Sequence, residues 1–308
     1  GADVKEITGL NDWIFDVSIT ANRPDCQSIF GLAREVAAAL GEPLKTPALD
    51  YTETEVEKEG FNVTVEAQDL CPRYIAHYVY DVKLGQSPAW MRRRLALVGN
   101  NSISNIVDIT NYIMRELGQP LHAFDCDYLE GNAINVRRAA EGEKIVTLDE
   151  KEFTLNPNNL VICDGKKPVA LAGIMGGLNS EVRDTTTEVM FEAAKFARDN
   201  IRRSSRALGQ GSDASQRYSK GVDEYTTEMA MKRALHLVEE LGAGKISKTH
   251  KNVNTGNSLE PTTFKTSVKK VNAVLGITVP DEDILRILTG LNFQPEINGD
   301  ELTLHFPA

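Results

Sequence analysis

The sequence predicts an α+β fold. A central module with mixed and antiparallel sheets is expected between a short α/β segment at the N-terminus and a small helical, winged-helix-like domain at the C-terminus. Short segments with the period-2 alternation of half-buried strands recur between residues 61 and 196. Amphipathic segments that end at glycine, a pattern typical of helices, interrupt and follow them. Two polar, turn-rich stretches, residues 42–60 and 248–264, are interpreted as linkers on either side of the module.

The first 50 residues predict one strand and one helix. The segment "DWIFDVSIT", residues 12–20, alternates apolar and polar residues and predicts a strand. A turn follows, and Ser28 is placed to cap a helix over residues 29–41 that stops at Gly41. We expect residues 1–50 to form one part of the chain.

The central module, residues 55–250, is expected to hold most of the strands. Its first helix has agreeing signals, with Ser87 as the N-cap, Pro88 in the first turn and Gly99 as the stop. The predicted helices lie at residues 87–99, 102–118, 197–209 and 225–242. The predicted strands lie at residues 61–67, 73–84, 133–139, 143–149, 151–155, 159–165, 167–177 and 187–196.

Residues 258–308 are expected to form a small third domain. Two helices are predicted at residues 266–276 and 280–293, and a strand at residues 301–308. Because that strand lies at the end of the sequence, we expect this domain to be truncated.

Composition and charge exclude several classes of protein. The chain has 308 residues, and no apolar run approaches the ~20 residues that cross a bilayer. The first residues lack the basic and apolar pattern of a signal peptide, so we expect a cytoplasmic protein without a membrane partner. The four cysteines are widely spaced and form no CxxC pair, which argues against a structural zinc site or a disulfide framework.

The net charge of −10 differs from that of proteins whose main function is to bind nucleic acid. Any contact with RNA would therefore use local basic patches. Two patches are candidates, Arg92, Arg93 and Arg94 and then Arg202, Arg203 and Arg206. Taken alone, each patch is more typical of a solvated helix face.

Motifs of the common nucleotide and metal chemistries are absent from the sequence. It has no GxGxxG after a strand, no Walker A lysine motif, no GxSxG and no HExxH, so we expect neither a cofactor nor a metal site in this chain. The glycines of "GIMGG", residues 173–177, indicate either a turn or a close backbone approach to a ligand.

Two titratable residues stand out in their local sequence. His122 lies in "GQPLHAFDCDYL", and on this stretch alone a lone histidine is more often structural than catalytic. Glu192 interrupts "VMFEAA", a strand that otherwise looks buried, and a buried carboxylate is unfavourable unless it is paired. Glu192 therefore either faces water at an edge or is kept to accept a proton donor from a ligand.

Several segments together resemble the β subunit of bacterial phenylalanyl-tRNA synthetase. They are "ANRPDCQSIFGLAREVAA", "SPAWMRRRL", "ISNIVDITNYIMRELGQPLHAFD", "LAGIMGG" and "SDASQRYSKGVD", and they follow the family's order across nearly the whole chain. The resemblance covers the middle part of that subunit. It implies that residues 1–50 are part of an N-terminal domain, that residues 55–250 are the tRNA-editing module and that residues 258–308 are the small helical domain.

The resemblance also implies partners. The family's enzyme attaches phenylalanine to tRNA(Phe) with ATP and Mg²⁺, both of which would be bound outside this chain. The implied partners are tRNA(Phe), a tyrosine or phenylalanine aminoacyl group, and the α subunit of an α2β2 assembly. No cofactor is implied for this chain itself.

The implied activity is hydrolysis of tyrosine wrongly attached to tRNA(Phe). An apolar pocket shaped for phenylalanine rejects an isostere with one added hydroxyl only about a hundredfold, so a second pocket that requires the hydroxyl is useful. By resemblance, Glu192 accepts that hydroxyl, Gly176 leaves room for the ring, and His122 orients the water or the ester. Gly177, Ser212 and Ala214 are implied to line the pocket, and the family often has threonine where Ser212 stands.

Two functions from different classes therefore remain open. The first is an editing hydrolase, and the second is a catalytically inactive structural and tRNA-docking fragment that needs the α subunit. A nucleotide-dependent ligase acting alone is disfavoured, because no ATP-binding motif is present.

Overall fold

The computed structural model describes residues 1–9, 11–256 and 262–306, and the chain forms two compact units. The larger unit comprises Gly1–Ser28 and Ala48–Gly256, and the smaller one Ile29–Pro47 and Asn257–Ala308. Among the described residues, no helix is both long and apolar enough to cross a membrane. The domain boundaries given above stay predictions.

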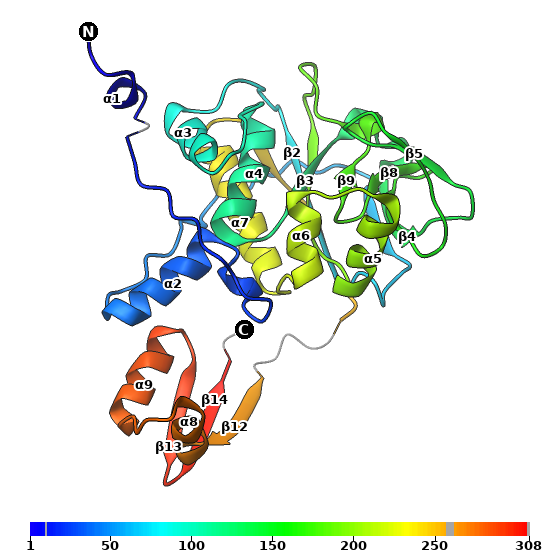
Figure 1. Cartoon of the computed structure of the whole chain (residues 1–308). Helices are drawn as coiled ribbons and strands as arrows, with labels where there is room; N and C mark the ends of the chain where they lie inside the picture. Colours follow the sequence, from blue (N-terminus) through cyan, green and yellow to red (C-terminus); the bar gives the residue numbers. More distant parts are fainter. Residues whose placement is uncertain (10, 257–261, 307–308) are drawn as a thin grey trace. The chain divides into compact units, whose positions relative to one another are not determined.

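Two sheets form the core of the larger unit (Figure 1). One sheet has the order β11-β2-β10-β3 with every pair antiparallel, and the other has the order β1-β4-β7-β8-β9 with only β1 and β4 parallel. The strands of the first sheet are β2 (Arg73–Tyr80), β3 (Leu121–Asp125), β10 (Val189–Lys195) and β11 (Lys245–Asn254). Those of the second are β1 (Asn62–Val65), β4 (Ala133–Arg138), β7 (Leu160–Cys163), β8 (Pro168–Leu171) and β9 (Met175–Gly176), and β5 (Lys144–Val146) pairs with β6 (Glu152–Thr154). The predicted α+β class with mixed and antiparallel sheets is confirmed.

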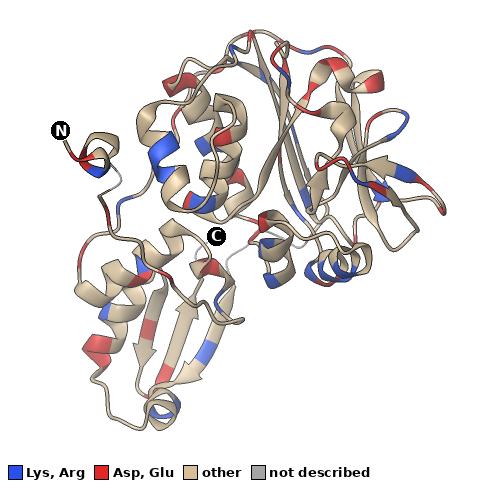
Figure 2. Ribbon diagram, turned by 45° about the horizontal axis from the view of Figure 1, so that its top comes forward, with Lys and Arg blue, Asp and Glu red and all other residues tan. Residues whose placement is uncertain are grey.

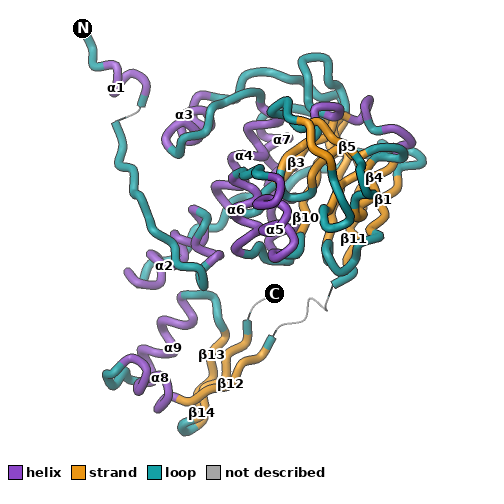
Figure 3. The backbone as a smooth tube through the Cα atoms, turned by 45° about the vertical axis from the view of Figure 1, so that its right-hand side comes forward, coloured by secondary structure: helices purple, strands orange, loops and turns teal. Residues whose placement is uncertain are grey.

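Helices cover the remaining face of the four-stranded sheet, so this sheet is buried on both sides (Figures 1 and 3). Helices α4 and α7 pack on it and on each other. The other face joins the core shared with the second sheet, to which β2 contributes Tyr74, Ala76 and Tyr78. Burial on both faces explains why β2 and β10 are apolar almost throughout rather than alternating. The described helices of this unit are α1 (Val4–Thr8), α3 (Ala89–Leu97), α4 (Asn105–Leu117), α5 (Arg198–Leu208), α6 (Asp213–Lys220) and α7 (Thr226–Glu240), with 3-10 turns at Pro24–Cys26, Cys126–Tyr128, Glu130–Asn132 and Leu178–Ser180.

The smaller unit is a three-stranded antiparallel sheet with helices. Its strand order is β12-β14-β13, with β12 (Thr263–Ser267), β13 (Gln294–Asn298) and β14 (Glu301–His305). Its helices are α2 (Ile29–Leu40), α8 (Val268–Leu275) and α9 (Asp281–Gly290). The predicted helices are present, while β12 and β13 were not foreseen from the sequence.

Three local predictions were wrong. Residues 12–20 form no strand; Trp13 and Phe15 are 89% and 85% exposed, and no described segment pairs with them. Residues 248–254, interpreted as a linker, belong to β11, an edge strand whose outward polar residues hide the apolar pattern. Ser87 does not cap α3, because Pro88 is the N-cap and the Ser87 hydroxyl donates to Asp108 Oδ2 at 2.6 Å.

Candidate active site

A cavity of about 490 Å³ lies in the larger unit, at the edge of the four-stranded sheet where β3 meets β10. Its walls also include α4, the segment around β8 and β9, and the start of α6, and they are mostly apolar. The volume lies within the roughly 300–1,000 Å³ of ordinary small-molecule sites. Of the residues predicted for the site, His122, Gly176, Glu192, Ser212 and Ala214 line this cavity.

Glu192 and His122 are direct cross-strand partners in the antiparallel pair of β10 and β3. Side chains alternate along a strand, so Glu192 shares its face with Met190 and Ala194, which belong to the core between the two sheets. His122 likewise shares its face with Phe124, and the two rings meet edge-on with centroids 4.5 Å apart. The register therefore places the carboxyl and the imidazole side by side on the inner face of the sheet.

Glu192 is a buried carboxyl without a charged partner among the described residues. Only 6% of the residue is exposed. Burial raises the pKa of Glu192 to about 8, and the neighbouring Tyr74 hydroxyl acts in the opposite direction. At neutral pH Glu192 is therefore mostly a neutral carboxylic acid, which both donates and accepts hydrogen bonds.

His122 is held neutral by its surroundings. Burial lowers the pKa of His122 to about 4, so the imidazole carries no charge at neutral pH. Its Nε2 atom is buried, and among the described residues it has no hydrogen-bond partner. An unpaired buried polar atom beside a cavity is unfavourable in the empty protein, and a bound ligand or water would satisfy it.

Gly176 is required by the close approach of His122. A Cβ atom at position 176 would lie 2.5 Å from His122 Cε1 and 2.9 Å from His122 Nε2. Strand β9 thus brings its backbone against the imidazole because no side chain separates them. Gly177 is different: it does not line the described cavity, and a Cβ there would lie 2.6 Å from the Val169 carbonyl oxygen, so its missing side chain serves packing against β8.

Ser212 anchors one wall of the cavity. It is the N-cap of α6 and forms a capping box with Ser215. Its Oγ donates to the Ile174 carbonyl at 2.6 Å and accepts from the Ser215 N–H at 3.0 Å. Because its only proton is used in this way, Ser212 positions the start of α6, with Ala214, against the segment that carries Gly176.

Several lining residues were not found from the sequence. Met114 comes from α4, Leu148 from the segment after β5, and Tyr218 from α6. Tyr218 is buried, and its hydroxyl donates to the Ala194 carbonyl at 2.9 Å. In the sequence, Met114 is marked only as part of the apolar face of a predicted helix, which does not indicate a cavity. No local pattern marks Leu148.

Cys126 is not an activated nucleophile. It is 5% exposed, and burial raises the pKa of its thiol to about 12. The thiol therefore stays protonated at neutral pH, and Cys126 does not line the described cavity. Lysine and arginine positions are interspersed with aspartate and glutamate positions along the described chain (Figure 2).

The class of protein to which this fold and this site belong is given by a match to a family model. A family model described as the B3/4 domain matches residues 70–243, a range that contains every residue predicted for the site. The chain belongs to this family.

Comparison with individual proteins identifies relatives within this family more closely. The chain is 47% identical over 303 residues to the phenylalanine--tRNA ligase beta subunit of Syntrophus aciditrophicus, covering 96% of this chain and 37% of that protein. It is 43% identical over 309 residues to the beta subunit of the same enzyme from Clostridium acetobutylicum, covering 100% of this chain and 39% of that protein. These matches confirm the resemblance inferred from the sequence, and the chain spans less than two fifths of these relatives' length.

A solved structure is also similar. It is an N-terminal fragment of the phenylalanyl-tRNA synthetase beta subunit from Pyrococcus horikoshii, with a TM-score of 0.44 and 17% identity. The match covers 94% of this chain and 80% of that one.

Proposed function

We propose that the cavity is an editing site that hydrolyses the ester between tyrosine and tRNA(Phe), in a protein that takes part in attaching phenylalanine to that tRNA. The observation that carries the proposal is Glu192: a buried carboxyl that has no charged partner among the described residues, in a mostly apolar cavity, directly opposite His122. Such a group selects ligands that bring their own hydrogen-bonding atom.

Recognition of the tyrosine hydroxyl follows from the burial of the Glu192 carboxyl away from any charged partner among the described residues. When a ligand enters the cavity, Glu192 loses its hydrogen bonds to water. The hydroxyl of a bound phenol replaces them. Phenylalanine offers no such atom and leaves the carboxyl without this hydrogen bond, at a cost of about 1–3 kcal/mol. That free energy corresponds to a preference for tyrosine of roughly 5- to 150-fold.

Hydrolysis itself needs water and positioning. The oxygen of water attacks the carbonyl carbon of the ester, the bond to the ribose oxygen breaks, and that oxygen leaves with a proton. A base with a pKa of about 4 removes protons poorly at neutral pH, so His122 acts by orienting water or the ester through Nε2. The ester is already activated, so a covalent nucleophile is not required.

The partners of the whole protein belong to this proposal. We infer that tRNA(Phe) and an α subunit bind the complete protein in the cytoplasm, and that ATP and Mg²⁺ bind outside this chain. Support comes from the named relatives, of which this chain spans less than two fifths.

A second candidate is a structural and tRNA-docking role without catalysis. The observation that favours it is the exposure of Arg202, Arg203 and Arg206 on α5, the helix that packs against α6. Phosphate contacts by such residues would hold RNA without any chemistry in the cavity.

Deacylation of tyrosyl-tRNA(Phe) and phenylalanyl-tRNA(Phe) by this chain tests the proposal. We expect the unaltered chain to hydrolyse the tyrosyl ester faster, Glu192→Ala to lose that preference, and His122→Ala to slow both reactions with little change in their ratio. Glu188→Gln is the matched control, because this carboxylate pairs with Lys58 and does not line the cavity.

Each contrary outcome has a separate meaning. Full selectivity in Glu192→Ala would remove Glu192 from recognition, and unchanged rates in His122→Ala would return His122 to a structural role. A folded chain that binds tRNA(Phe) but leaves the ester intact would overturn the hydrolase and favour docking.

A further inference from the structure

A second cluster of titratable groups lies on the other face of the four-stranded sheet. His77 of β2 is directly opposite His250 of β11, and the two rings stack with centroids 5.4 Å apart. Because Ala76 and Tyr78 point into the core between the sheets, alternation places His77 on the opposite face from Glu192. Glu53 completes the cluster: its Oε1 lies 4.0 Å from His77 Nε2.

Each histidine already has one ring nitrogen bound to a backbone carbonyl. His77 Nε2 lies 2.8 Å from the Ser247 oxygen, and His250 Nδ1 lies 3.2 Å from the Lys248 oxygen. A neutral imidazole that donates through one nitrogen keeps a lone pair on the other. Histidines that bind metals usually have this arrangement, in which a carbonyl fixes the tautomer and the ring orientation.

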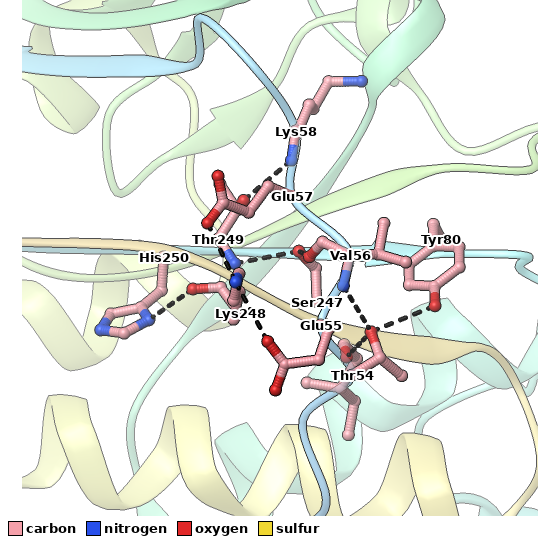
Figure 4. A network of polar contacts seen from close by, with 11 residues as sticks. Thr54, Glu55, Val56, Glu57, Lys58, Tyr80, Ser247, Lys248, Thr249 and His250 are labelled. Carbon is pink, nitrogen blue, oxygen red and sulfur yellow. Dashed lines mark hydrogen bonds and ion pairs between the residues drawn. The ribbon is translucent and has the colours of Figure 1, made fainter.

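The backbone that carries Glu53 is fixed to the same strand as His250 (Figure 4). The Thr54 N–H donates to the Ile246 carbonyl at 2.8 Å, and Ser247 Oγ donates to the Val56 carbonyl at 2.6 Å. The Lys58 N–H donates to Thr249 Oγ1 at 2.8 Å. Glu53 is therefore held beside the histidine pair by the chain on its C-terminal side, and its exposed carboxylate accepts a hydrogen bond from the Tyr51 hydroxyl at 3.4 Å.

We propose that Glu53, His77 and His250 bind one divalent transition-metal ion of the zinc class. One ring nitrogen from each histidine and one Glu53 oxygen lie within 4.8 Å of one another. Two imidazoles and one carboxylate are ligands that Zn²⁺, Ni²⁺ and Cu²⁺ accept, whereas Mg²⁺ and Ca²⁺ prefer oxygen ligands alone. Water would occupy the remaining coordination positions.

Binding needs the cluster to contract and His250 to turn out of the stack, because the in-plane lone pairs of two stacked imidazoles do not point at one ion. Ligand atoms at 2.0–2.2 Å around a tetrahedral ion are roughly 3.3 Å apart, so they must move closer together. Glu53 and His250 are exposed and can change rotamer, whereas the buried His77 stays fixed.

The ion would connect three separate stretches of the chain, namely the segment before β1 and the strands β2 and β11. It would act as a clip that holds Glu53 and its neighbours to the edge of the sheet. This site is independent of the cavity at Glu192, so a failure of one proposal leaves the other standing.

Calorimetric titration of the EDTA-treated, dialysed chain with ZnCl₂ tests the site, with MgCl₂ as a second titrant. We expect one Zn²⁺ per chain and no Mg²⁺ binding. His250→Asn and Glu53→Gln should each weaken Zn²⁺ binding about tenfold or more. His236→Asn is the matched control, because His236 lies 3.3 Å from the Glu240 carboxylate in the same unit but outside the cluster.

A second readout identifies the ligands directly. On addition of Zn²⁺, the side-chain ¹⁵N resonances of His77 and His250 should shift while that of His236 does not. No Zn²⁺ binding would overturn the proposal, and so would binding that is unaffected by His250→Asn and Glu53→Gln. Loss of binding in His236→Asn alone would also contradict it.

Discussion

Two of the buried carboxyl groups in the larger unit, those of Asp108 and Glu192, lie in opposite kinds of surroundings. In the first turn of α4, Asp108 is fully buried and accepts hydrogen bonds from Ser87 Oγ, Ser102 Oγ and the Ile103 N–H at 2.6, 2.5 and 2.8 Å. In the middle of β10, Glu192 is nearly as buried, has no charged partner among the described residues, and lines a cavity.

The difference separates a carboxylate with three hydrogen-bond donors in the fold from one that we propose binds a ligand. Three donors stabilise the charge of Asp108, and the positive end of the α4 dipole adds to them. Glu192 instead has its pKa raised to about 8, a state that the fold alone gives no reason to maintain. Burial by itself therefore does not mark a functional carboxyl, whereas burial without a charged partner beside a cavity makes Glu192 a candidate.

The largest expected effect is on stability at the satisfied carboxylate. Asp108→Ala should lower the free energy of unfolding by about 3–5 kcal/mol, because it removes three hydrogen bonds to a buried carboxylate, one of them from the buried Ser87 hydroxyl. Glu192→Gln, which replaces a mostly neutral acid with an amide of the same shape, should change it by less than about 1 kcal/mol at pH 7. Urea unfolding of both variants measures the contrast, and equal losses would remove the distinction between the two regions.

Gly176→Ala should disturb the site more than the fold as a whole. The new methyl group would overlap the His122 ring at 2.5 Å, and such overpacking costs typically 1–3 kcal/mol. We expect slower deacylation of tyrosyl-tRNA(Phe), because His122 must move. Gly211→Ala is the control, since a Cβ there meets nothing within 4 Å. If both variants deacylate alike, the contact between Gly176 and His122 does not matter for the reaction.

The raised pKa of Glu192 predicts a dependence of stability on pH. Between its unfolded value of 4.5 and its folded value of about 8, the folded state holds a proton that the unfolded state has released. Stability due to this group therefore falls as the pH rises, by about 2 kcal/mol between pH 6.5 and 8. His122 and His77, with folded pKa values of about 4, contribute an opposite slope only below about pH 6.5.

Comparison with Glu192→Gln isolates that slope. The unaltered chain should lose stability relative to the variant across pH 6.5–8, as measured by urea unfolding at each pH. Parallel curves would show that Glu192 is ionised in the folded protein throughout this range.

The smallest effect is expected at Ser212. Ser212→Ala removes the N-cap of α6 and the hydrogen bond to Ile174, and should destabilise the chain by about 1 kcal/mol. Ser212→Thr keeps both interactions and should retain stability. A loss of stability in the threonine variant equal to that in the alanine variant would argue against the capping role.

The sequence predicted most elements of the larger unit, because their apolar patterns and glycine stops are local. It missed β3 and read part of β11 as a linker: β3 is short, and β11 is an edge strand with many polar residues. It predicted a strand at residues 12–20 from alternation alone, yet a strand also needs a partner, and pairing is not a local property.

The candidate site shows the same limit. Glu192 was conspicuous because it interrupts an apolar strand, and His122 because it follows a turn. Their pairing across β10 and β3 joins positions 70 residues apart and depends on register, which no local pattern contains. The assignment of Ser212 to the pocket came from resemblance, and only the structure shows that its hydroxyl is already used as a helix cap.

The central idea is that Glu192 selects a ligand by its hydroxyl group. Calorimetric titration of the chain with L-tyrosine and with L-phenylalanine at pH 7 tests it most directly, using Glu192→Leu as the apolar variant of similar size. We predict tighter binding of tyrosine, by roughly 5- to 150-fold, and loss or reversal of that preference in the leucine variant. Equal affinities for the two amino acids in the unaltered chain, or a preference for tyrosine that survives in Glu192→Leu, would contradict the account.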